Sequence, residues 1–524
     1  MRIAIICNGQ TLLSWQRRAL ELIAPDHSLY LLVCQEPPAK RSPWRHGLYY
    51  LLNLASVRNR ANRPVPFPTA EIEIADRLDF DPQQDGAWSA LPDEVLDWVK
   101  ANRIDAIVKF GLNLLRIPDR ERLAAPILSY HHGDPRSYRG RPAGFYELAQ
   151  GESFLGQVVQ ILSNKLDSGE VIAFAQSRVW PHSYRRTLVE AYSLSPALLP
   201  QALAALAQGS KLPIDPSGRN YRLPGNAAVL RSVARQGAAL VRRLAYGSFV
   251  EKHWRVSTAE ARDAANPLAA IAEAGARQSE WRTFPIRPPH RFHADPFFHD
   301  GAILVEAMNS RSGKGELLRI AGDRQQAIGG LAGHVSYPGA IELDGRICIV
   351  PEICDWSRPA VFAIEGDKAV RLADLDIDED SILDPTLLRH DGRVYLFGNR
   401  ASEGPSVLRL WSADDLLGRF EPHPASPIRT SIRGGRMAGA IHRWPDGLFR
   451  LGQDFRKGYG DGIVAFRIDE LTAQTYREAE IGAASFDRVE GPHTLDMQPG
   501  RLLFDWYEER VSSLAGIRRL MNRL

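Results

Sequence analysis

The sequence is poor in cysteine and has no large excess of charge of either sign. Its 524 residues include four cysteines, none of them in a CxxC pair, and 65 Lys and Arg stand against 62 Asp and Glu, a net charge of +3. So few scattered cysteines are typical of a reducing compartment, so we expect no disulfide and no metal site. A near-neutral chain lacks a broad phosphate-binding surface, so we expect no nucleic-acid partner.

Long hydrophobic runs are also missing. No stretch approaches the roughly 18 apolar residues of a membrane-spanning helix. The N-terminal stretch MRIAIICNG has an apolar run of only about six residues, which is too short for the core of a signal peptide and predicts a buried strand instead. We therefore expect a cytoplasmic protein, with any membrane contact being peripheral and on the inner face of the membrane.

The first 210 residues have the pattern of an α/β domain. Apolar runs rich in β-branched residues alternate with helical patterns, as in βαβ units, and predict a largely parallel sheet covered by helices. The expected strands are Arg2–Cys7, Ser28–Cys34, Ala106–Lys109, Ile127–Tyr130 and Val158–Leu162, and the expected helices are Leu12–Ile23, Pro92–Ala101 and Thr187–Ala207.

A polar cluster follows the strand Ile127–Tyr130, in the stretch LSYHHGDPRSYRGRPAGFYEL. Open α/β sheets bind ligands outside the carboxyl ends of their strands, where this cluster begins. His131 or His132 has the chemistry of a general base or an electrophile, although a single histidine at a strand end is more often structural. Asp167, in a Leu-Asp-Ser-Gly-Glu turn, is a candidate to orient the imidazole.

The stretch from about Ile104 to Ile172 resembles the catalytic domain of folate-dependent formyltransferases. That family has Asn-x-His, then Tyr-Arg-Gly, then Asp-x-Gly. The matching tripeptides here are Ser129-Tyr130-His131, Tyr138-Arg139-Gly140 and Asp167-Ser168-Gly169. Two positions depart from the family: Ser129 replaces an asparagine that binds the developing oxyanion, and Gln160 replaces a second histidine.

The resemblance implies a role for each matching residue. His131 would polarise the formyl group of 10-formyltetrahydrofolate, the formyl donor, while Asp167 orients His131 and relays the proton, and Ser129 stands in for the oxyanion donor. The segment KFGLNLL would form the folate pocket with Phe110, Gly111, Leu112 and Leu114. Substrate-binding roles would fall to His132, Arg139 and Gly140.

After residue 280 the helical pattern fades and a repeat appears. Five segments pair two apolar strands around a Gly-containing turn, and their markers recur 42 to 54 residues apart, close to the length of a four-stranded propeller blade. The markers are Pro296, Pro338, Pro385, Gly439 and Pro492. We therefore predict a five-bladed β-propeller over residues 248–510; an irregular β-sandwich with chance Asp-Gly turns is the alternative.

The propeller region has resemblances of its own. HADPF, DPTLLRHDGRVYLFG and EGPH are similar to the acidic motifs of five-bladed glycosidases, and the repeat is also similar to the N-terminal region of plant glucosamine inositolphosphorylceramide transferases. The glycosidase resemblance implies that Asp295, Asp384 and Glu490 converge on the propeller axis as carbohydrate-binding groups. Asp before Pro is also common in turns, and a non-catalytic propeller is the favoured interpretation.

Two basic segments complete the chain. Residues 211–247 predict a helical linker, with apolar residues at helical spacing and arginines between them, and residues 511–524 predict a second amphipathic helix. Such helices lie on anionic membranes or, more often, pack on a neighbouring domain.

Together these patterns predict an N-formyltransferase that acts on an amino group, carried by a small molecule or a nucleotide- or lipid-linked amino sugar. The propeller would recognise the carbohydrate. Two alternatives stay open: a carbohydrate-binding protein whose formyltransferase-like domain is silent, and a glycosidase-like propeller enzyme.

Overall fold

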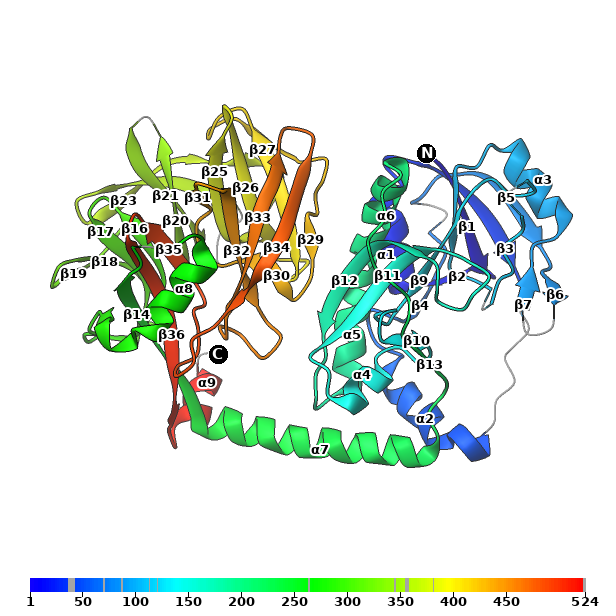
Figure 1. Cartoon of the computed structure of the whole chain (residues 1–524), viewed down its shortest axis with the longest axis horizontal. Helices are drawn as coiled ribbons and strands as arrows, with labels where there is room; N and C mark the ends of the chain where they lie inside the picture. The colour runs from blue at the N-terminus through cyan, green and yellow to red at the C-terminus, as the bar shows by residue number, and fades with distance from the viewer. Residues whose placement is uncertain are drawn as a thin grey trace. The chain divides into compact units, whose positions relative to one another are not determined.

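The computed structural model describes residues 1–35, 43–68, 71–85, 88–112, 114–119, 121–262, 264–343, 345–353, 358–379 and 381–521. The chain divides into two compact units, Met1–Arg242 and Arg243–Leu524 (Figure 1). The first unit is an open α/β sheet with helices on both faces, and the second consists of five successive sheets. This confirms the predicted fold class.

The first unit is built on a seven-stranded sheet. In spatial order its strands are β12 (Glu170–Arg178), β11 (Phe154–Ile161), β9 (Ile127–His131), β8 (Ala106–Lys109), β1 (Arg2–Asn8), β3 (Ser28–Cys34) and β5 (Ile74–Phe80). The strands from β9 to β5 are parallel, whereas β11 runs antiparallel to β9 and β12 antiparallel to β11. The run predicted at Val158–Leu162 is therefore a strand, but it lies in the antiparallel part of the sheet.

Helices cover both faces of this sheet, which explains the continuous apolar runs of its central strands. The helices α1 (Ser14–Ile23) and α6 (Leu198–Ala207) share a hydrophobic core with one face, and α3 (Asp93–Ala101) packs on the other. The helix predicted over residues 187–207 is divided into α5 (Tyr184–Leu194), a short 3₁₀ turn and α6. The remaining helices before the linker are α2 (Pro43–Ser56) and α4 (Phe145–Gln150).

The stretch expected to be a linker starts inside the first unit. Its residues Arg219–Tyr221 form β13, which pairs in parallel with β10 (Tyr138–Gly140), next to the predicted site. The long helix α7 then runs from Asn226 to Phe249. No helix in the described part of the chain has both the length and the hydropathy needed to cross a membrane.

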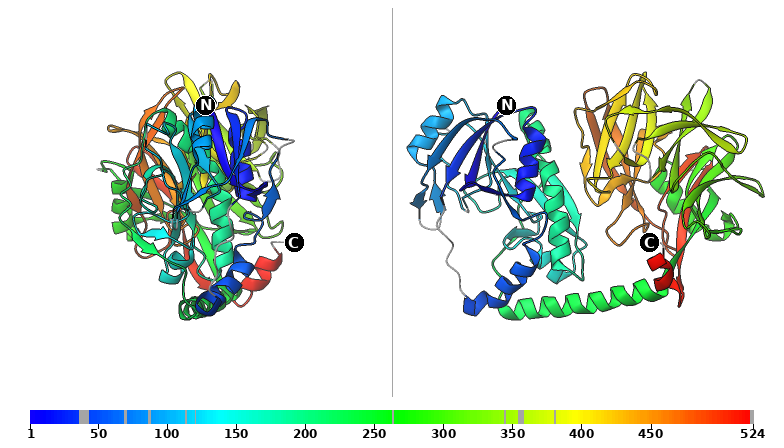
Figure 2. Two further views of the ribbon diagram at one scale, coloured as in Figure 1. Left: turned by 90° about the vertical axis from the view of Figure 1, so that its right-hand side faces the viewer. Right: turned by 180° about the vertical axis from the view of Figure 1, so that it is seen from behind.

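The second unit is a five-bladed propeller whose blades are four-stranded sheets with accessory strands (Figures 1 and 2). From the innermost strand outward, the first two blades are β16 (His290–His299), β17 (Ala302–Asn309), β18 (Gly315–Ala321), β19 (Arg324–Ala327), and β20 (Val335–Leu343), β21 (Arg346–Ile353), β22 (Ala360–Glu365), β23 (Lys368–Asp374). The next two are β25 (Ile382–His390), β26 (Arg393–Arg400), β27 (Val407–Ala413), β28 (Arg419–Pro422), and β30 (Arg433–Met437), β32 (Gly447–Asp454), β33 (Ile463–Leu471), β34 (Tyr476–Ala484).

The fifth blade joins the two ends of the propeller. Its inner strands β35 (Leu495–Gln498) and β36 (Arg501–Val511) come from the end of the chain, and its outer strands β14 (Val250–Glu260) and β15 (Arg282–Thr283) come from the start of the unit. The ladder between β14 and β36 extends from Val250 opposite Val511 to Glu260 opposite Arg501. This pairing closes the ring of blades.

The Asp-Gly pairs form the predicted hairpin turns. Asp300-Gly301 and Asp391-Gly392 have positive φ at both residues, as the two-residue turns that match strand twist require, and they join β16 to β17 and β25 to β26. Of the cysteines, Cys7, Cys34 and Cys348 are buried thiols, and Cys354 lies outside the described residues.

Candidate functional sites

Strand β9 delivers His131 to the carboxyl edge of the sheet, and the following turn holds its ring. Nε2 of His131 lies 2.9 Å from the carbonyl oxygen of Tyr138, and the ring is buried. A side chain at Gly133 would meet the His131 ring 2.7 Å away, so glycine is needed for this turn to close. The imidazole is thus fixed by the chain segment that follows it.

Asp167 approaches the other ring nitrogen from a neighbouring loop. Its Oδ1 lies 3.5 Å from Nδ1 of His131, and its Oδ2 accepts a 2.8 Å hydrogen bond from the backbone N–H of Gly140. An oxygen therefore lies near each ring nitrogen of His131, the Tyr138 carbonyl oxygen at Nε2 and the Asp167 carboxylate at Nδ1. The pair that the motif spacing predicted is therefore formed.

Two residues brace the loop that carries Asp167. Gln160 is buried, and its Oε1 accepts a 3.0 Å hydrogen bond from Gly169 N–H. Arg139 donates hydrogen bonds to Ser168 Oγ at 2.5 Å and to the Gly218 carbonyl oxygen at 2.6 Å. Gln160 thus fixes the loop that carries Asp167. Arg139, predicted to bind substrate, has two of its nitrogens engaged within the protein.

The other residues predicted from the polar cluster lie in two environments. Ser129 is on the same face of β9 as His131 and is buried, and its Oγ lies 3.5 Å from the Tyr130 carbonyl oxygen. His132 faces the opposite side of the strand, where its Nε2 is 2.8 Å from Ser195 Oγ and Trp15 and Tyr192 pack against its ring. Burial, and then His131, lower the pKa of His132 to about 3, so its ring stays neutral.

The predicted folate segment is mostly packed into the protein. Phe110 contacts the rings of Trp15 and Tyr130, and Leu112 is buried in the core beneath the sheet. A side chain at Gly111 would lie 2.9 Å from the backbone of β1, so the segment crosses that strand closely. Leu114 alone keeps a partly exposed side chain outside the core clusters. Of the four predicted folate-pocket residues, Gly111 and Leu112 are therefore buried.

A pocket beside His131 contains an acidic residue that the motifs did not indicate. It is lined by His131, Arg139, Gly140, Arg141, Tyr146, Glu147 and Tyr221 among others. Glu147, on α4, is only 2% exposed. Burial, helped by Glu152 and Asp134, raises the pKa of Glu147 to about 8. The pocket therefore combines an imidazole with a carboxyl group that readily keeps a proton.

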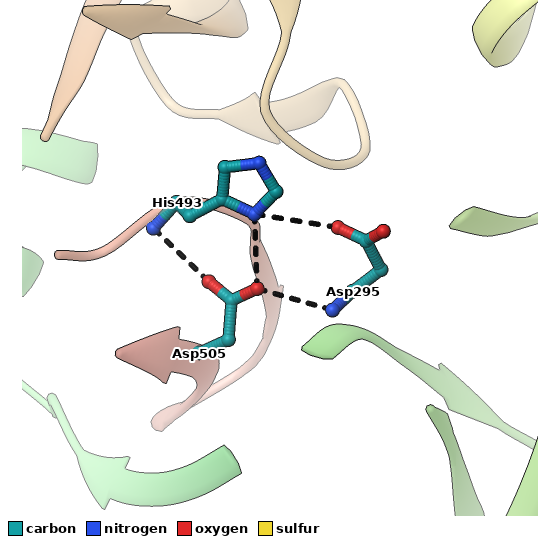
Figure 3. A group of neighbouring side chains, drawn as sticks. All are labelled: Asp295, His493 and Asp505. Carbon is teal, nitrogen blue, oxygen red and sulfur yellow. Dashed lines mark hydrogen bonds and ion pairs between the residues drawn. The ribbon is translucent and has the colours of Figure 1, made fainter. Parts of the chain in front are cut away.

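A second polar cluster lies inside the propeller, which Figure 3 shows around His493. Nδ1 of His493 is 3.1 Å from Asp505 and 3.5 Å from Asp295, and Thr494 donates a 2.6 Å hydrogen bond to Asp295. Burial alone would lower the pKa of His493, but Asp505 and Asp295 raise it above its ordinary value. Burial raises the pKa of Asp295 to about 6, against the attraction of His493.

Although these three side chains have the residue types of a metal site, their carboxylate oxygens already accept several hydrogen bonds, and Nε2 of His493 is left without a hydrogen-bond partner among the described residues. Asp505 accepts hydrogen bonds from the backbone N–H groups of Asp295, His493 and Thr494 and faces the protonated edge of His493. A cation would have to compete with these N–H donors for the same oxygens. The arrangement is better described as a buried ion pair that joins the first and last blades.

Asp384 joins this region from the third blade. Its carboxylate accepts bonds from Arg436 at 2.5 and 2.8 Å and from Gln453 at 3.0 Å. Two further buried acids lie near: burial, with Asp384, raises the pKa of Glu352 to about 8, and burial holds the pKa of Glu306 well above its usual range. We call Asp295, Glu306, Glu352, Asp384, Arg436, His493 and Asp505 the axial cluster.

Glu490 differs in exposure from the two acids that were predicted with it. Asp295 and Asp384 both belong to the axial cluster, but the Glu490 side chain is exposed and its backbone pairs with Tyr507 in the last blade. The EGPH motif contributes His493 to the cluster in place of its acid. Asp295 and Asp384 have φ of +46° and +47°, and each interrupts the pairing of its strand, so both Asp-Pro pairs lie at strand irregularities and not in turns.

Comparison with known proteins gives a match for each unit. Residues 261–495 match the family model of the N-terminal region of glucosamine inositolphosphorylceramide transferase 1. The chain is 27% identical to that transferase of Arabidopsis thaliana over 157 residues, 29% of this chain and 20% of the relative. It is 26% identical to that of Oryza sativa subsp. japonica over 222 residues, 37% of this chain and 28% of the relative. The chain thus spans less than a third of either relative's length.

The solved structures similar to this chain include formyltransferases. The glycinamide ribonucleotide transformylase 1 of Symbiobacterium toebii aligns with 19% identity and a TM-score of 0.26, over 40% of this chain and 88% of its own. WlaRD, a sugar 3N-formyl transferase, aligns with 8% identity and a TM-score of 0.30, over 62% of this chain and 98% of its own. The matched proteins reported for both units are named as transferases.

Proposed function

We propose that the α/β unit transfers a formyl group from 10-formyltetrahydrofolate to the amino group of an amino sugar. The observation behind this proposal is the meeting of His131, Asp167 and Glu147 at the carboxyl edge of the sheet. When bound, the donor supplies a formyl carbon that an amine can attack.

Glu147 has the properties of the group that prepares the amine. An amino sugar enters solution largely as an ammonium ion, which is not a nucleophile until it loses a proton. A buried carboxylate both attracts the ammonium and takes up its proton easily, because burial favours the neutral carboxyl. The pKa of about 8 is close to that of such an amine, so the transfer needs little energy.

His131 and Asp167 would handle the second proton, which the nitrogen loses as the amide forms. Asp167 keeps the imidazole oriented and stabilises the charge that the ring acquires. To contact the reacting group, Nε2 of His131 exchanges its hydrogen bond with the Tyr138 carbonyl for one with the substrate. Ser129, two residues earlier on the same strand face, is our candidate for a hydroxyl donor to the developing oxyanion.

We further propose that the propeller recognises the sugar part of the acceptor through the axial cluster. Buried carboxyl groups with raised pKa values, beside the aromatic rings of Trp254 and Tyr459, suit the binding of a polyhydroxylated ligand. The similarity of this unit to a family named for glucosamine transfer supports a carbohydrate ligand.

The proposal predicts that the chain formylates amino-sugar nucleotides. The full-length protein would be incubated with 10-formyltetrahydrofolate and a panel of such nucleotides, and the products examined by mass spectrometry for the gain of one carbonyl. Asp167→Asn should slow transfer by at least about a hundredfold, because it removes the charge that supports His131. Asp215→Asn, at an exposed position in the same unit, should not.

Two results would contradict the proposal. The first is an absence of product with every acceptor although the protein is folded by circular dichroism. The second is transfer that proceeds equally in the wild type and in Asp167→Asn. The first result would favour a carbohydrate-binding protein whose α/β unit has no catalytic role. The second would show that Asp167 takes no part in the transfer.

A further inference from the structure

One face of the α/β unit is apolar, basic and without acidic residues. It is formed by α2 and by the part of α7 up to Arg242. Neither helix contains a single Asp or Glu, while the two together contain Arg45, Arg231, Arg235, Arg242 and Arg243. Most surfaces of soluble proteins mix charges of both signs, so this composition is unusual for a solvated helix pair.

Helix α7 is exposed along nearly its whole length. Only Val229 and Ser232 of its 24 residues are buried. Its exposed apolar residues, Leu230, Val233, Leu240 and Val241, recur at helical spacing, and Leu230 and Val241 are 60% and 67% exposed. Because a helix turns about 100° per residue, these four lie on one side, and Arg231 and Arg242 fall on another side.

Helix α2 extends this surface at the start of α7. The side chain of Asn226, the first residue of α7, accepts a 3.0 Å hydrogen bond from Leu48 N–H and donates one to the Trp44 carbonyl. Trp44 itself is 93% exposed, and Leu51 and Leu54 of α2 are also exposed. An exposed tryptophan is costly in water but favourable at the boundary between lipid headgroups and acyl chains.

We propose that this face, defined by Trp44, Leu51, Leu54, Leu230, Val241, Arg231 and Arg242, docks the protein on an anionic lipid membrane. The charge of the face favours an anionic membrane, because arginines without neighbouring acids on the two helices complement phospholipid headgroups. The leucines and Trp44 enter the apolar layer beneath the headgroups. The inference is independent of formyl transfer. It would bring an acceptor anchored in the membrane within reach of the molecule.

The test is flotation of the full-length protein with lipid vesicles. Vesicles of phosphatidylcholine containing phosphatidylglycerol should carry the protein to the top of the gradient, and vesicles of phosphatidylcholine alone should not. High salt should release the protein, since screening weakens attraction to the headgroups. Equal binding to both kinds of vesicle, or binding to neither, would overturn the proposal.

Paired variants separate the electrostatic contribution of the arginines to membrane binding from the contribution of the apolar side chains. Arg231→Gln with Arg242→Gln should weaken partitioning by about thirtyfold, from about 1 kcal/mol for each arginine. Leu230→Gln with Val241→Gln should weaken it at least about tenfold through the lost apolar contact. The matched controls, Arg311→Gln and Leu417→Gln, replace exposed residues of the propeller and should bind like the wild type. All six positions are exposed, so the variants should fold.

A second copy of the chain is the competing occupant of this face. Light scattering over a range of protein concentrations would detect it without vesicles. If the protein forms a dimer that Leu230→Gln with Val241→Gln dissociates, and the protein does not float with anionic vesicles, the face is a protein interface and the proposal fails. Vesicle binding that neither paired variant weakens would also refute it.

Discussion

Glu147 shows how a single residue acquires its chemistry from packing. The local sequence GFYELAQ is typical of a short amphipathic helix, in which a glutamate normally faces water. Here Phe145 and Leu148 of α4 join a hydrophobic cluster with Tyr184 and Leu188, and this packing buries Glu147 with them. No sequence pattern marks such a position, whereas His131 and Asp167 could be found because their spacing matches known motifs.

The buried carboxyl predicts a pH dependence of stability. Unfolded, Glu147 has its ordinary pKa of 4.5, and folded it has a pKa of about 8. Between these values the folded chain binds more protons than the unfolded one, so the free energy of unfolding falls as pH rises through this window. Glu147→Gln removes the titration, so the variant should gain stability relative to the wild type as pH rises from about 5 to about 8.5.

Urea unfolding at several pH values, followed by circular dichroism, would measure this difference. The neighbouring Asp134 and Glu152 shift the pKa of Glu147 in the same direction as burial, and Arg139, Arg141 and His131 line the same pocket. Glu121→Gln, at an exposed position, is the control. Parallel stability curves for the wild type and Glu147→Gln would contradict the burial argument.

In the propeller, Asp295 and Glu490 form a natural pair of test and control. Asp295→Asn replaces a buried partner of His493 and Thr494 and should weaken sugar binding at least about tenfold, because a hydrogen-bonded charge is lost from the axial cluster. Glu490→Gln should leave binding unchanged, since that side chain is exposed. Calorimetric titration with amino-sugar oligosaccharides would compare the two. Release of reducing sugar by the wild type would instead favour a glycosidase.

At the scale of elements, the local order of the chain was predictable and the long-range pairing was not. Strands β1, β3, β8 and β9 lie close to their predicted positions because apolar runs of β-branched residues specify buried strands. The direction of β11 and the addition of β13 beside β10 depend on partners distant in sequence. Hydrophobic periodicity contains no information on those partners, so both features were missed.

The short ladder between β10 and β13 explains why Gly140 matters. Its φ is +86°, and a Cβ there would lie 2.2 Å from the Tyr221 carbonyl oxygen. Gly140→Ala should therefore push β13 away and cost about 1–3 kcal/mol from backbone strain alone. Since the Gly140 N–H also binds Asp167, the substitution should reduce activity more than stability.

Thermal unfolding and transfer assays on one preparation would test this expectation. Gly209→Ala is the matched control, because that glycine also has a positive φ of +64° but open space around its Cβ position. Gly209→Ala should lower the free energy of unfolding through the same backbone strain, but it should leave the transfer activity unchanged. Equal activity of the two variants would mean that the ladder does not position Asp167.

At the scale of the whole molecule, the repeat spacing predicted the number of blades but not how the ring closes. Each blade has local signals, such as Asp-Gly turns between apolar strands, and these recur along the chain. The pairing of β14 with β36 joins residues about 250 positions apart, and the segment VEKHWRVSTAE lies outside the repeat. Only the three-dimensional structure identifies it as part of the last blade.

This closure decides which fragments can exist on their own. The stretch 261–495, the part that matches the family model, contains neither β14 nor β36. Cutting the chain there would remove β14, β36 and all but the first residue of β35, which leaves only β15 of that blade. The buried side chains of Leu503, Phe504 and Trp506 would be lost with β36. Residues 243–524 should give one cooperative thermal transition, and residues 261–495 should give none. A sharp transition for the shorter fragment would contradict this.

Val250 and Val511, near the two ends of the propeller sequence, pair with each other in the same blade. The ring of blades therefore does not require the chain to begin and end at this blade. A peptide bridge across that junction would let the polypeptide start at any of the exposed connections between blades without altering a single native pairing. Other domains could then be fused at a different blade, just as the α/β unit precedes a strand of the last blade in this sequence. The modular order of this chain is thus one choice among several that the same circular scaffold permits.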